Sequence, residues 1–239
     1  MEIAVQMYSL REDVHNIGLS ATLELVRDAG FGQVELAGFY DLRPSELKKL
    51  LDNYGLSAPS AHIGYDLLCT RFDTVGSFVK KLGIKSVVVP WLAAEQIGNV
   101  RVQKKLQSLS ARLAKKGVAF AYHNHSQEFA EPDTLIKLTD AVPGIKLQLD
   151  IFWAVSAGVD VVEFIKKYAD RITQLHIKEL SPDGVDADNP VVGDGVSKSA
   201  EAVKAAGDIG LVILEFEKVG TDHGTYMAES LKSIKNFAG

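Results

Sequence analysis

Residues that bind metal ions or move protons end four short apolar runs in the second half of the chain. The runs finish as Tyr122-His123-Asn124-His125, Leu149-Asp150, Leu175-His176-Ile177-Lys178 and Leu214-Glu215-Phe216-Glu217. Side chains alternate between the two faces of a strand, so each run directs its polar residues to one face. Polar groups among apolar neighbours cost free energy unless they are paired or bind a ligand. The pattern therefore indicates a shared site for a metal ion or for acid–base chemistry.

The elements that position these residues repeat along the whole chain. An amphipathic stretch ends in glycine and an apolar or β-branched run follows at once, as in Leu82-Gly83-Ile84 and Ile209-Gly210-Leu211. Glycine after a helix supplies the left-handed residue that ends it. We expect strands at Ile3–Tyr8, Gln33–Leu36, Ser57–His62, Ser86–Val89, Val118–His123, Lys146–Asp150, Ile172–His176 and Leu211–Phe216. Apolar residues at helical spacing predict helices at Leu19–Ala29, Pro44–Asn53, Val100–Lys116, Val161–Tyr168, Ser199–Ala206 and Tyr226–Phe237.

Eight alternating strand–helix units in 239 residues predict an α/β protein, a single (β/α)8 TIM barrel of about 30 residues per unit. The alternative is an open doubly wound sheet, which requires a glycine-rich phosphate loop after the first strand. Tyr8-Ser9-Leu10-Arg11-Glu12 stands there instead. No linker or low-complexity segment interrupts residues 1–239, so we expect one domain.

Composition excludes several classes of protein. The chain is 46% hydrophobic and 24% charged, which is typical of a globular protein and not of a disordered one. A net charge of −5 argues against a nucleic-acid partner, because such binding depends on lysine and arginine. We find no apolar run that could span a membrane and no signal peptide at the N-terminus. With Cys69 as its one cysteine the chain forms no internal disulfide, so we expect a cytoplasmic protein.

In a TIM barrel the active site lies at the carboxyl ends of the strands. Residues at or just beyond those ends are therefore candidates to contact a substrate: His62, Glu35, Trp91, Trp153 and Glu217. The two tryptophans could form an apolar wall against a sugar ring, or could belong to the core. Lys178 shares a face with His176, which favours a ligand contact over the alternative of a structural ion pair with Glu217.

The sequence resembles the xylose isomerase-like TIM barrels, a superfamily of sugar phosphate isomerases and epimerases that also contains inosose dehydratases and endonuclease IV. The resemblance rests on the eight-unit pattern, the Tyr-His-Asn-His strand end followed by Glu128, Leu-Asp-x-x-Trp at 149–153, His-x-Lys at 176–178 and Gly193-Asp194-Gly195-Val196. It extends over nearly the whole chain, and its specific motifs lie in the second half. The superfamily includes isomerases, epimerases, lyases and hydrolases, so the resemblance implies the fold more strongly than the substrate.

This resemblance implies a metal centre with one ligand from each of the last four strands. Asp150, His176 and Glu215 match three of the family's positions, whereas His123 stands where many relatives have glutamate. The strand-five ligand is then His123, or else His125 two residues further on. Such a mixed donor set suits one divalent ion, with manganese expected first and cobalt, iron or zinc as alternatives. A buried polar network without a metal is the remaining alternative.

The same resemblance implies a metal-dependent isomerase or epimerase acting on a carbohydrate or cyclic polyol. The ion would stabilise an enediolate formed when the carbon beside a carbonyl group loses its proton. Glu215 or Glu128 would remove that proton, His125 would contact the substrate, and Lys178 and His62 would position its hydroxyl groups. The acidic loop at 179–192 has few basic residues, which argues against a phosphorylated substrate.

Three other functions compete with this hypothesis. A lyase would dehydrate a keto-inositol or keto-sugar through the same enolate, and the loss of a carboxylate at His123 favours it. A non-catalytic carbohydrate-binding barrel is the non-enzyme alternative, and the net negative charge disfavours an endonuclease IV-like protein. We also expect a homodimer, and we expect Gln148 or Gln174 to accept the second N–H of a ligating imidazole.

Overall fold

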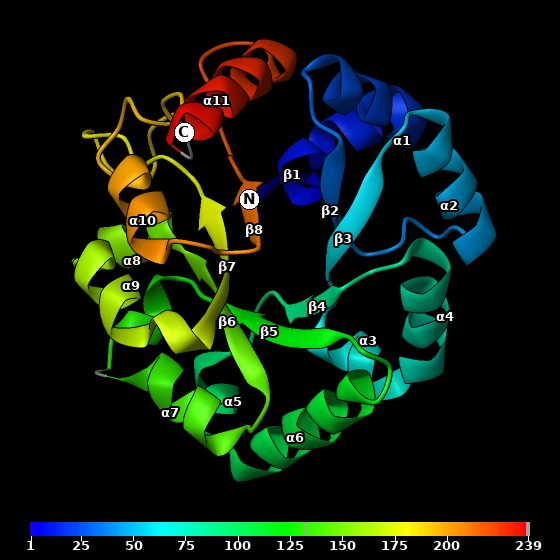
Figure 1. The fold of residues 1–239 in the computed structure, drawn as a ribbon, viewed down its shortest axis with the longest axis vertical. Helices are drawn as coiled ribbons and strands as arrows, with labels where there is room; N and C mark the ends of the chain where they lie inside the picture. The colour runs from blue at the N-terminus through cyan, green and yellow to red at the C-terminus, as the bar shows by residue number, and fades with distance from the viewer. Residues whose placement is uncertain (132, 238–239) are drawn as a thin grey trace.

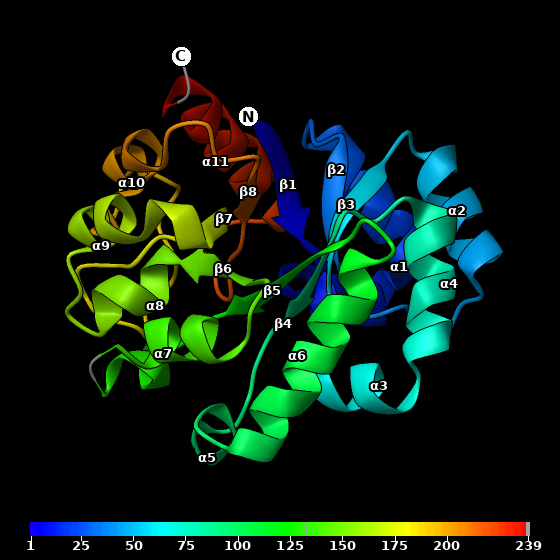
Figure 2. The same ribbon diagram turned by 60° about the horizontal axis from the view of Figure 1, so that its bottom comes forward.

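Eight parallel strands follow one another around a closed barrel, with helices on the outside, in a computed structural model that describes residues 1–131 and 133–237 (Figures 1 and 2). Neighbouring strands pair in chain order, and β1 closes the barrel by pairing with β8. The strands are β1 (Glu2–Gln6), β2 (Gln33–Ala37), β3 (Ser57–His62), β4 (Ser86–Val89), β5 (Ala119–His123), β6 (Ile145–Asp150), β7 (Ile172–Ile177) and β8 (Leu211–Leu214). The predicted TIM barrel is confirmed.

The helices lie between consecutive strands, and three short 3₁₀ turns at Met7–Leu10, Ser126–Phe129 and Ala169–Arg171 extend some of the loops. The helices are α1 (Arg11–Asp28), α2 (Pro44–Asn53), α3 (Tyr65–Thr70), α4 (Phe72–Leu82), α5 (Ala94–Ile97), α6 (Val100–Ala114), α7 (Thr134–Ala141), α8 (Ile151–Ser156), α9 (Val161–Tyr168), α10 (Ser199–Ala206) and α11 (His223–Phe237). Within the described residues, no helix has the length and apolar character needed to cross a membrane.

The apolar core lies mainly between the strands and the surrounding helices. Outward-facing side chains such as Leu175, Leu214 and Phe216 belong to this outer core and are fully buried. Inside the barrel the apolar residues are fewer, with Ala4, Leu211 and Ile213 forming a small separate cluster. Above that cluster the interior is polar, because strand alternation directs glutamine, serine, glutamate and histidine side chains inward.

Two irregular strand pairs lie beside this polar interior. The register shifts between β2 and β3, where Glu35 pairs with Ser60, and between β6 and β7, where Gln148 pairs with Gln174. A β-bulge adds a residue to one strand and redirects the side chains that follow it. At both shifts the paired side chains hydrogen-bond to each other between neighbouring strands, so the shifts align polar partners.

Some predicted boundaries are wrong. Gly207, with φ of +58°, follows the last residue of α10, whereas Gly210 has no left-handed conformation and pairs its carbonyl with Glu2 N. The first helix begins earlier than Leu19 but changes direction at Gly18, whose φ of +84° is non-helical. β1 ends at Gln6 and β8 at Leu214, so Tyr8 and Phe216 lie in the loops beyond their strands.

Candidate metal centre

Four potential ligands meet inside the barrel near the carboxyl ends of β5 to β8. His123 and Asp150 end their strands, His176 lies in β7, and Glu215 follows β8 directly, with its backbone N–H on the carbonyl of Ile177. One ligand atom from each lies within 4.8 Å of the others. The four residues are at most 6% exposed. The structure thus brings together the four side chains for which the sequence predicts metal binding.

Asp150 shows that this set suits a cation. Its Oδ1 accepts a hydrogen bond from Trp153 N at 3.0 Å, which begins α8, but among the described residues nothing hydrogen-bonds its buried Oδ2. Oδ2 lies 3.9 Å from Nε2 of His123. Burial, together with the neighbouring Glu215 carboxylate, raises the pKa of Asp150 to about 7. An unpartnered buried carboxylate oxygen is costly, and a cation between it and the imidazole would satisfy both.

His176 lies between two carboxylates. Its Nδ1 is 2.6 Å from Glu215 Oε2 and its Nε2 is 2.6 Å from Glu35 Oε2. Burial lowers the pKa of His176, but the charge of Glu35 and the hydrogen bonds to both carboxylates outweigh it and raise that pKa to about 10. With no metal present the ring is therefore protonated on both nitrogens. A metal ion beside Glu215 would replace the Nδ1 proton while Glu35 keeps the other.

A polar layer beneath the ligands holds the two imidazoles in place. Glu35 accepts hydrogen bonds from Gln6 at 2.6 Å, Ser60 at 2.6 Å and Gln148 at 2.7 Å, and is fully buried. Burial raises the pKa of Glu35, but the charges of His62 and His176 and the hydrogen bonds prevail and lower it to about 2. Glu35 thus remains an anion.

Gln148 orients His123. Its Oε1 lies 3.1 Å from His123 Nδ1, so that ring donates through Nδ1 and leaves Nε2 free to face Asp150. The expected role of Gln148 as acceptor for a ligating imidazole is therefore observed. For His176 the acceptor is Glu35, whereas Gln174 accepts from Gln148 at 2.6 Å. Sequence alternation placed these residues on one face but gave no sign of which neighbour each would reach.

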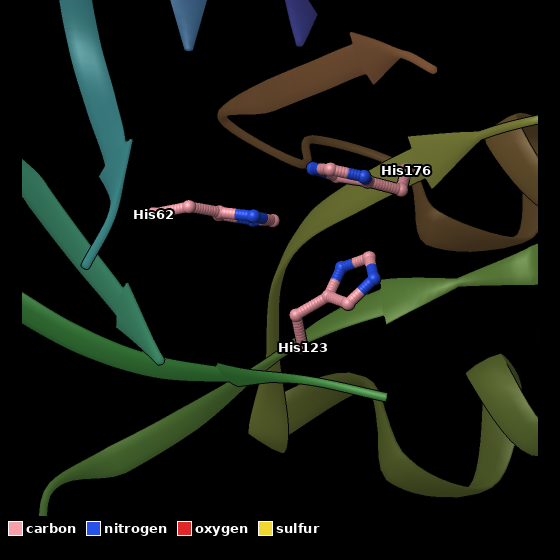
Figure 3. Close-up of side chains that lie close together, drawn as sticks. All are labelled: His62, His123 and His176. Carbon is pink, nitrogen blue, oxygen red and sulfur yellow. The ribbon is translucent and has the colours of Figure 1, made fainter. Parts of the chain in front are cut away.

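Three imidazoles from β3, β5 and β7 gather at the same place (Figure 3). The ring centroids of His62, His123 and His176 lie 4.6 to 5.2 Å apart, and the rings of His62 and His176 are parallel within 4°. Burial lowers the pKa of His62, against the opposing charge of Glu35, and it lowers the pKa of His123 further, well below the usual value. Each of the three also offers a ligand atom within 4.8 Å of the others. His62 Nε2, however, contacts Gln148 Oε1 at 2.6 Å and lies 3.2 Å from Glu35 Oε2, so His62 connects the polar layer to the space above it.

A cavity of about 410 Å³ opens above the metal ligands. It is lined by Tyr8, Ala37, His62, Pro90, Trp91, His123, His125, Glu215 and Glu217. Of the residues predicted to contact substrate, His62, Trp91 and Glu217 thus reach this cavity, and Tyr8, Ala37 and Pro90 were missed. Tyr8 and Trp91 are half exposed, at 51% and 52%, and form its rim. Both residues follow the end of a strand, and the same reasoning that selected Trp91 from the sequence could therefore have selected Tyr8.

Glu35 and Glu128, in contrast, lie outside the lining of this cavity. Glu35 belongs to the polar layer below it. Glu128 is buried and accepts hydrogen bonds from Tyr122 Oη at 2.5 Å, from His125 N at 2.8 Å and from Gln127 Nε2 at 3.1 Å. Its carboxylate thus supports the loop behind His125. His125 itself lines the cavity, and burial lowers its pKa, which keeps the imidazole neutral.

Lys178 and Trp153 form a second group beside the cavity. Lys178 is 1% exposed, and its Nζ lies 2.8 Å from Glu217 Oε1. The ammonium group also lies 4.3 Å from the ring centroid of Phe152 and 4.7 Å from that of Trp153. The ion pair with Glu217, which was the alternative to a ligand contact for Lys178, is therefore present. Lys178 itself does not line the first cavity, whereas its partner Glu217 does.

Comparisons with known proteins show which proteins this chain resembles in sequence and in fold. An inosose dehydratase of Lacticaseibacillus casei is 26% identical over an alignment of 261 positions, gaps included, that covers 87% of this chain and 86% of that protein. The solved structure of a sugar phosphate isomerase/epimerase from Parabacteroides distasonis superposes with a TM-score of 0.78 at 22% identity, covering 100% of this chain and 95% of the other. The IolI protein with a bound zinc atom superposes with a TM-score of 0.76 at 17% identity, covering 100% and 98%. At these identities the two structures establish the fold alone.

The model of a known family matches most of the sequence. Its description is xylose isomerase-like TIM barrel, and it matches residues 23–237. This span includes the expected ligands on β5 to β8 and all the strands except β1. The chain belongs to the xylose isomerase-like TIM barrel family.

Proposed function

We propose that the protein is a metal-dependent isomerase or epimerase that acts on a carbohydrate or cyclic polyol through an enediolate. The observation that carries the proposal is the convergence of His123, Asp150, His176 and Glu215 under an open cavity, with the buried Oδ2 of Asp150 left without a partner among the described residues. Two imidazoles and two carboxylates suit manganese, our first candidate, or cobalt, iron or zinc. A bound divalent ion would supply Lewis-acid polarisation of a carbonyl group.

The chain's own residues would handle the proton. Glu215 lines the cavity and stays ionised, because its contact with His176 outweighs the effect of burial and keeps its pKa well below the usual value. It is the carboxylate placed to take a proton from the carbon beside the carbonyl group. His125 lines the same cavity with a neutral ring and is our candidate to hold or return a proton. Glu128 acts behind His125, since its oxygens are engaged by Tyr122 and the backbone of His125.

Other lining residues would bind and orient the substrate. His62 and the Glu217 carboxylate offer hydrogen bonds to hydroxyl groups, and Lys178 holds Glu217 in place. Trp91 supplies an apolar wall at the rim of the cavity. A second copy of the chain, in a homodimer, stays an expectation that light scattering of the purified protein would test.

The experiment that tests this proposal is exchange of the substrate's α-proton with solvent deuterium. The purified protein is analysed for bound metal and then incubated in D₂O with a panel of keto-sugars and keto-inositols. We expect exchange, detected by NMR, that a chelator abolishes and added metal restores. Absence of exchange with every compound, in protein shown to contain metal, would contradict the proposal.

A lyase is the second candidate, and one observation favours it. The strand-five ligand is the imidazole of His123, so this site has one carboxylate fewer than a pair of opposed carboxylates would give an epimerase. The relation to an inosose dehydratase points the same way. After the same proton abstraction, loss of a neighbouring hydroxyl group creates a conjugated enone. Ultraviolet absorbance that grows during turnover would identify dehydration, and its absence during proton exchange would identify isomerisation.

A further inference from the structure

A second, smaller cavity lies beside the proposed substrate cavity at the same end of the barrel. Its volume is about 190 Å³, and its walls come from α8, from the end of β7 with the loop that follows, and from the loop after β8. Whole small-molecule pockets usually occupy roughly 300–1,000 Å³, so this space suits one ring or a short branch of a ligand. Its position at the carboxyl ends of the strands is where a TIM barrel binds substrate.

The two cavities share a wall. Glu217 lines both, and its carboxylate is held by Lys178 on the side of the second cavity. His125 of the first cavity packs against Trp153 of the second, with ring centroids 5.4 Å apart. Asn189 fixes this wall, because its Oδ1 accepts from Glu217 N at 2.8 Å and its Nδ2 donates to Glu179 O at 2.9 Å. A ligand beside Glu217 in the first cavity therefore lies one side chain away from the second.

The lining of the second cavity fits a hydroxylated ring. Trp153 presents aromatic surface, the buried ring of Phe152 lies behind it with its plane at 89° to the indole, and Val185 adds apolar surface nearby. Sugar-like rings combine apolar faces with polar edges, and aromatic side chains with a few fixed polar groups match that combination. The buried Nε1 of Trp153 is a donor for which no described residue provides an acceptor.

The charges of the lining argue for a neutral ligand. Lys178 and Lys218 are balanced by Asp186 and Glu217, so the cavity has no excess of positive charge to hold a phosphate or carboxylate group. Lys178 is nearly fully buried, and its ammonium group is already engaged by Glu217. Hydroxyl groups can donate to the carboxylates of Asp186 and Glu217 and accept from the exposed ammonium group of Lys218.

We propose that the second cavity is a subsite for a second hydroxylated ring, so that the substrate is a two-ring compound such as a glycoside whose reacting ring lies in the first cavity. This inference rests on the proposed function for the identity of the reacting ring. The bond between the two rings would pass over the Glu217 side chain, which lines both cavities, and the second ring would provide additional binding energy and selectivity.

The test compares one-ring and two-ring sugars as ligands of the metal-loaded protein. Dissociation constants are measured by ligand-observed NMR for glucose, galactose and myo-inositol, and for cellobiose, maltose and lactose. We expect at least one disaccharide to bind about tenfold more tightly than its component monosaccharide, with saturation transfer to both rings. Equal affinities for all one-ring and two-ring sugars would overturn the inference.

Variants test whether the tighter binding of two-ring sugars depends on the second cavity. Ala187→Trp, or Val185→Trp at a lining position that is 48% exposed, fills the second cavity and should reduce the affinity ratio between two-ring and one-ring sugars to about one. Asp183→Trp, in the same loop but outside the lining, should leave that ratio unchanged, and thermal unfolding confirms that each variant is folded. A ratio that survives both filling substitutions would place the second ring elsewhere and overturn the inference.

The test of the subsite can fail or succeed independently of the test of the proposed function. Metal-dependent proton exchange with one-ring substrates and a ratio of about one would retain the function and reject the subsite. A ratio that Ala187→Trp abolishes, without proton exchange on any substrate, would retain the subsite and reject the function. If none of these sugars binds, the subsite is rejected, and the function is decided by proton exchange with the keto-sugars and keto-inositols alone.

Discussion

At the scale of single residues, the site is organised around an imidazole that contacts a carboxylate at each ring nitrogen. Metal binding at His176 must displace the proton on Nδ1, and binding at Asp150 requires the ionised carboxylate. Raised pKa values of about 10 for His176 and about 7 for Asp150 mean that protons compete with the metal near neutrality. Glu35, on the far side of the ring, is thereby as much a part of the site as the ligands.

We expect metal affinity to rise between pH 6 and pH 8 and binding to release protons. His176 and Asp150 each hold a proton in the metal-free protein that the bound metal must displace. Raising the pH removes this competing proton and therefore favours metal binding. Isothermal titration calorimetry in two buffers of different ionisation enthalpy measures the number of protons released. An affinity that is constant over this range, with no proton release, would show that the ion binds elsewhere.

Replacing Glu35 by glutamine should weaken metal binding by about 10- to 100-fold, because it removes the acceptor that orients His176. The same change should cost about 1–3 kcal/mol of stability, since one amide oxygen cannot serve the donors that now converge on two carboxylate oxygens. Calorimetry measures the first effect and urea unfolding the second. Glu229→Gln, at an exposed position on α11, is the control.

The stability difference for Glu35→Gln should depend on pH in a stated direction. The pKa of Glu35 falls from 4.5 to about 2 on folding, so the ionised carboxylate stabilises the protein above pH 4.5. That contribution is lost as the pH falls towards 2. The difference between wild type and variant should therefore shrink over this interval, and a difference that grows on acidification would contradict the assignment.

At the scale of elements, the ends of the strands carry the residues of the proposed site, and short turns beyond them fix the positions of some of these side chains. The 3₁₀ turn at Ser126–Phe129 is held by Glu128, which accepts from the phenol of Tyr122 and from the backbone of His125. The turn thus fixes where the His125 ring enters the cavity. A carboxylate in this role acts on the reaction through His125 rather than on the substrate.

Glu128→Ala should lower the free energy of unfolding by about 1–3 kcal/mol, because it leaves the buried Tyr122 hydroxyl and the His125 N–H without their acceptor. Urea denaturation measures this change. The matched variant Glu128→Gln keeps an acceptor oxygen and should retain more of both stability and turnover than alanine does. If Glu128→Gln abolished turnover at wild-type stability, Glu128 would act directly as an acid or base.

Element by element, the sequence predicts the barrel well and its polar contacts less well. Strand alternation and terminal glycines locate all eight strands, and β3 and β4 match to the residue. The short helix α8 was missed because its start depends on the Asp150 side chain receiving Trp153 N. Likewise, the partner of His176 could not be predicted, because Glu35 is 141 residues away and alternation gives a face but no cross-barrel neighbour.

At the scale of the whole molecule, stability and the site draw on different parts of the barrel. The large apolar core lies outside the strands, while the interior near the carboxyl ends is polar. The four candidate ligands therefore add little apolar packing, and Asp150 buries an oxygen that receives no hydrogen bond from any described residue. Such a group favours binding at a cost in the stability of the metal-free protein.

Asp150→Asn should consequently leave the metal-free protein at least as stable as wild type while removing its stabilisation by metal. The pKa of Asp150 is raised from 3.8 to about 7, so its destabilising effect grows between those pH values and is complete above them. Thermal unfolding with a chelator should thus show a larger gain for Asp150→Asn at pH 8 than at pH 4. Metal at 100 times the Kd should stabilise wild type by about 2.7 kcal/mol.

The control for this prediction is Asp73→Asn, at a side chain that is 99% exposed. It should resemble wild type at each pH and with or without metal. If metal still raised the unfolding temperature of Asp150→Asn as much as that of wild type, Asp150 would not be a ligand. A variant that is less stable than wild type with the chelator present would show that its second oxygen has a structural role.

The placement of the aromatic residues has an optical consequence. The chain contains two tryptophans, and both lie at the proposed site: Trp91 at the rim of the first cavity, and Trp153 between His125 and Lys178 at the wall of the second. Tryptophan fluorescence of the unmodified protein, excited at a wavelength that tyrosine does not absorb, therefore originates entirely at the mouth of the barrel. The indole of Trp91 reports changes in solvent at the rim, and the half-buried indole of Trp153 reports changes in charge beside it. Variants that keep one tryptophan each would therefore distinguish the arrival of a ligand in the first cavity from the response of the wall.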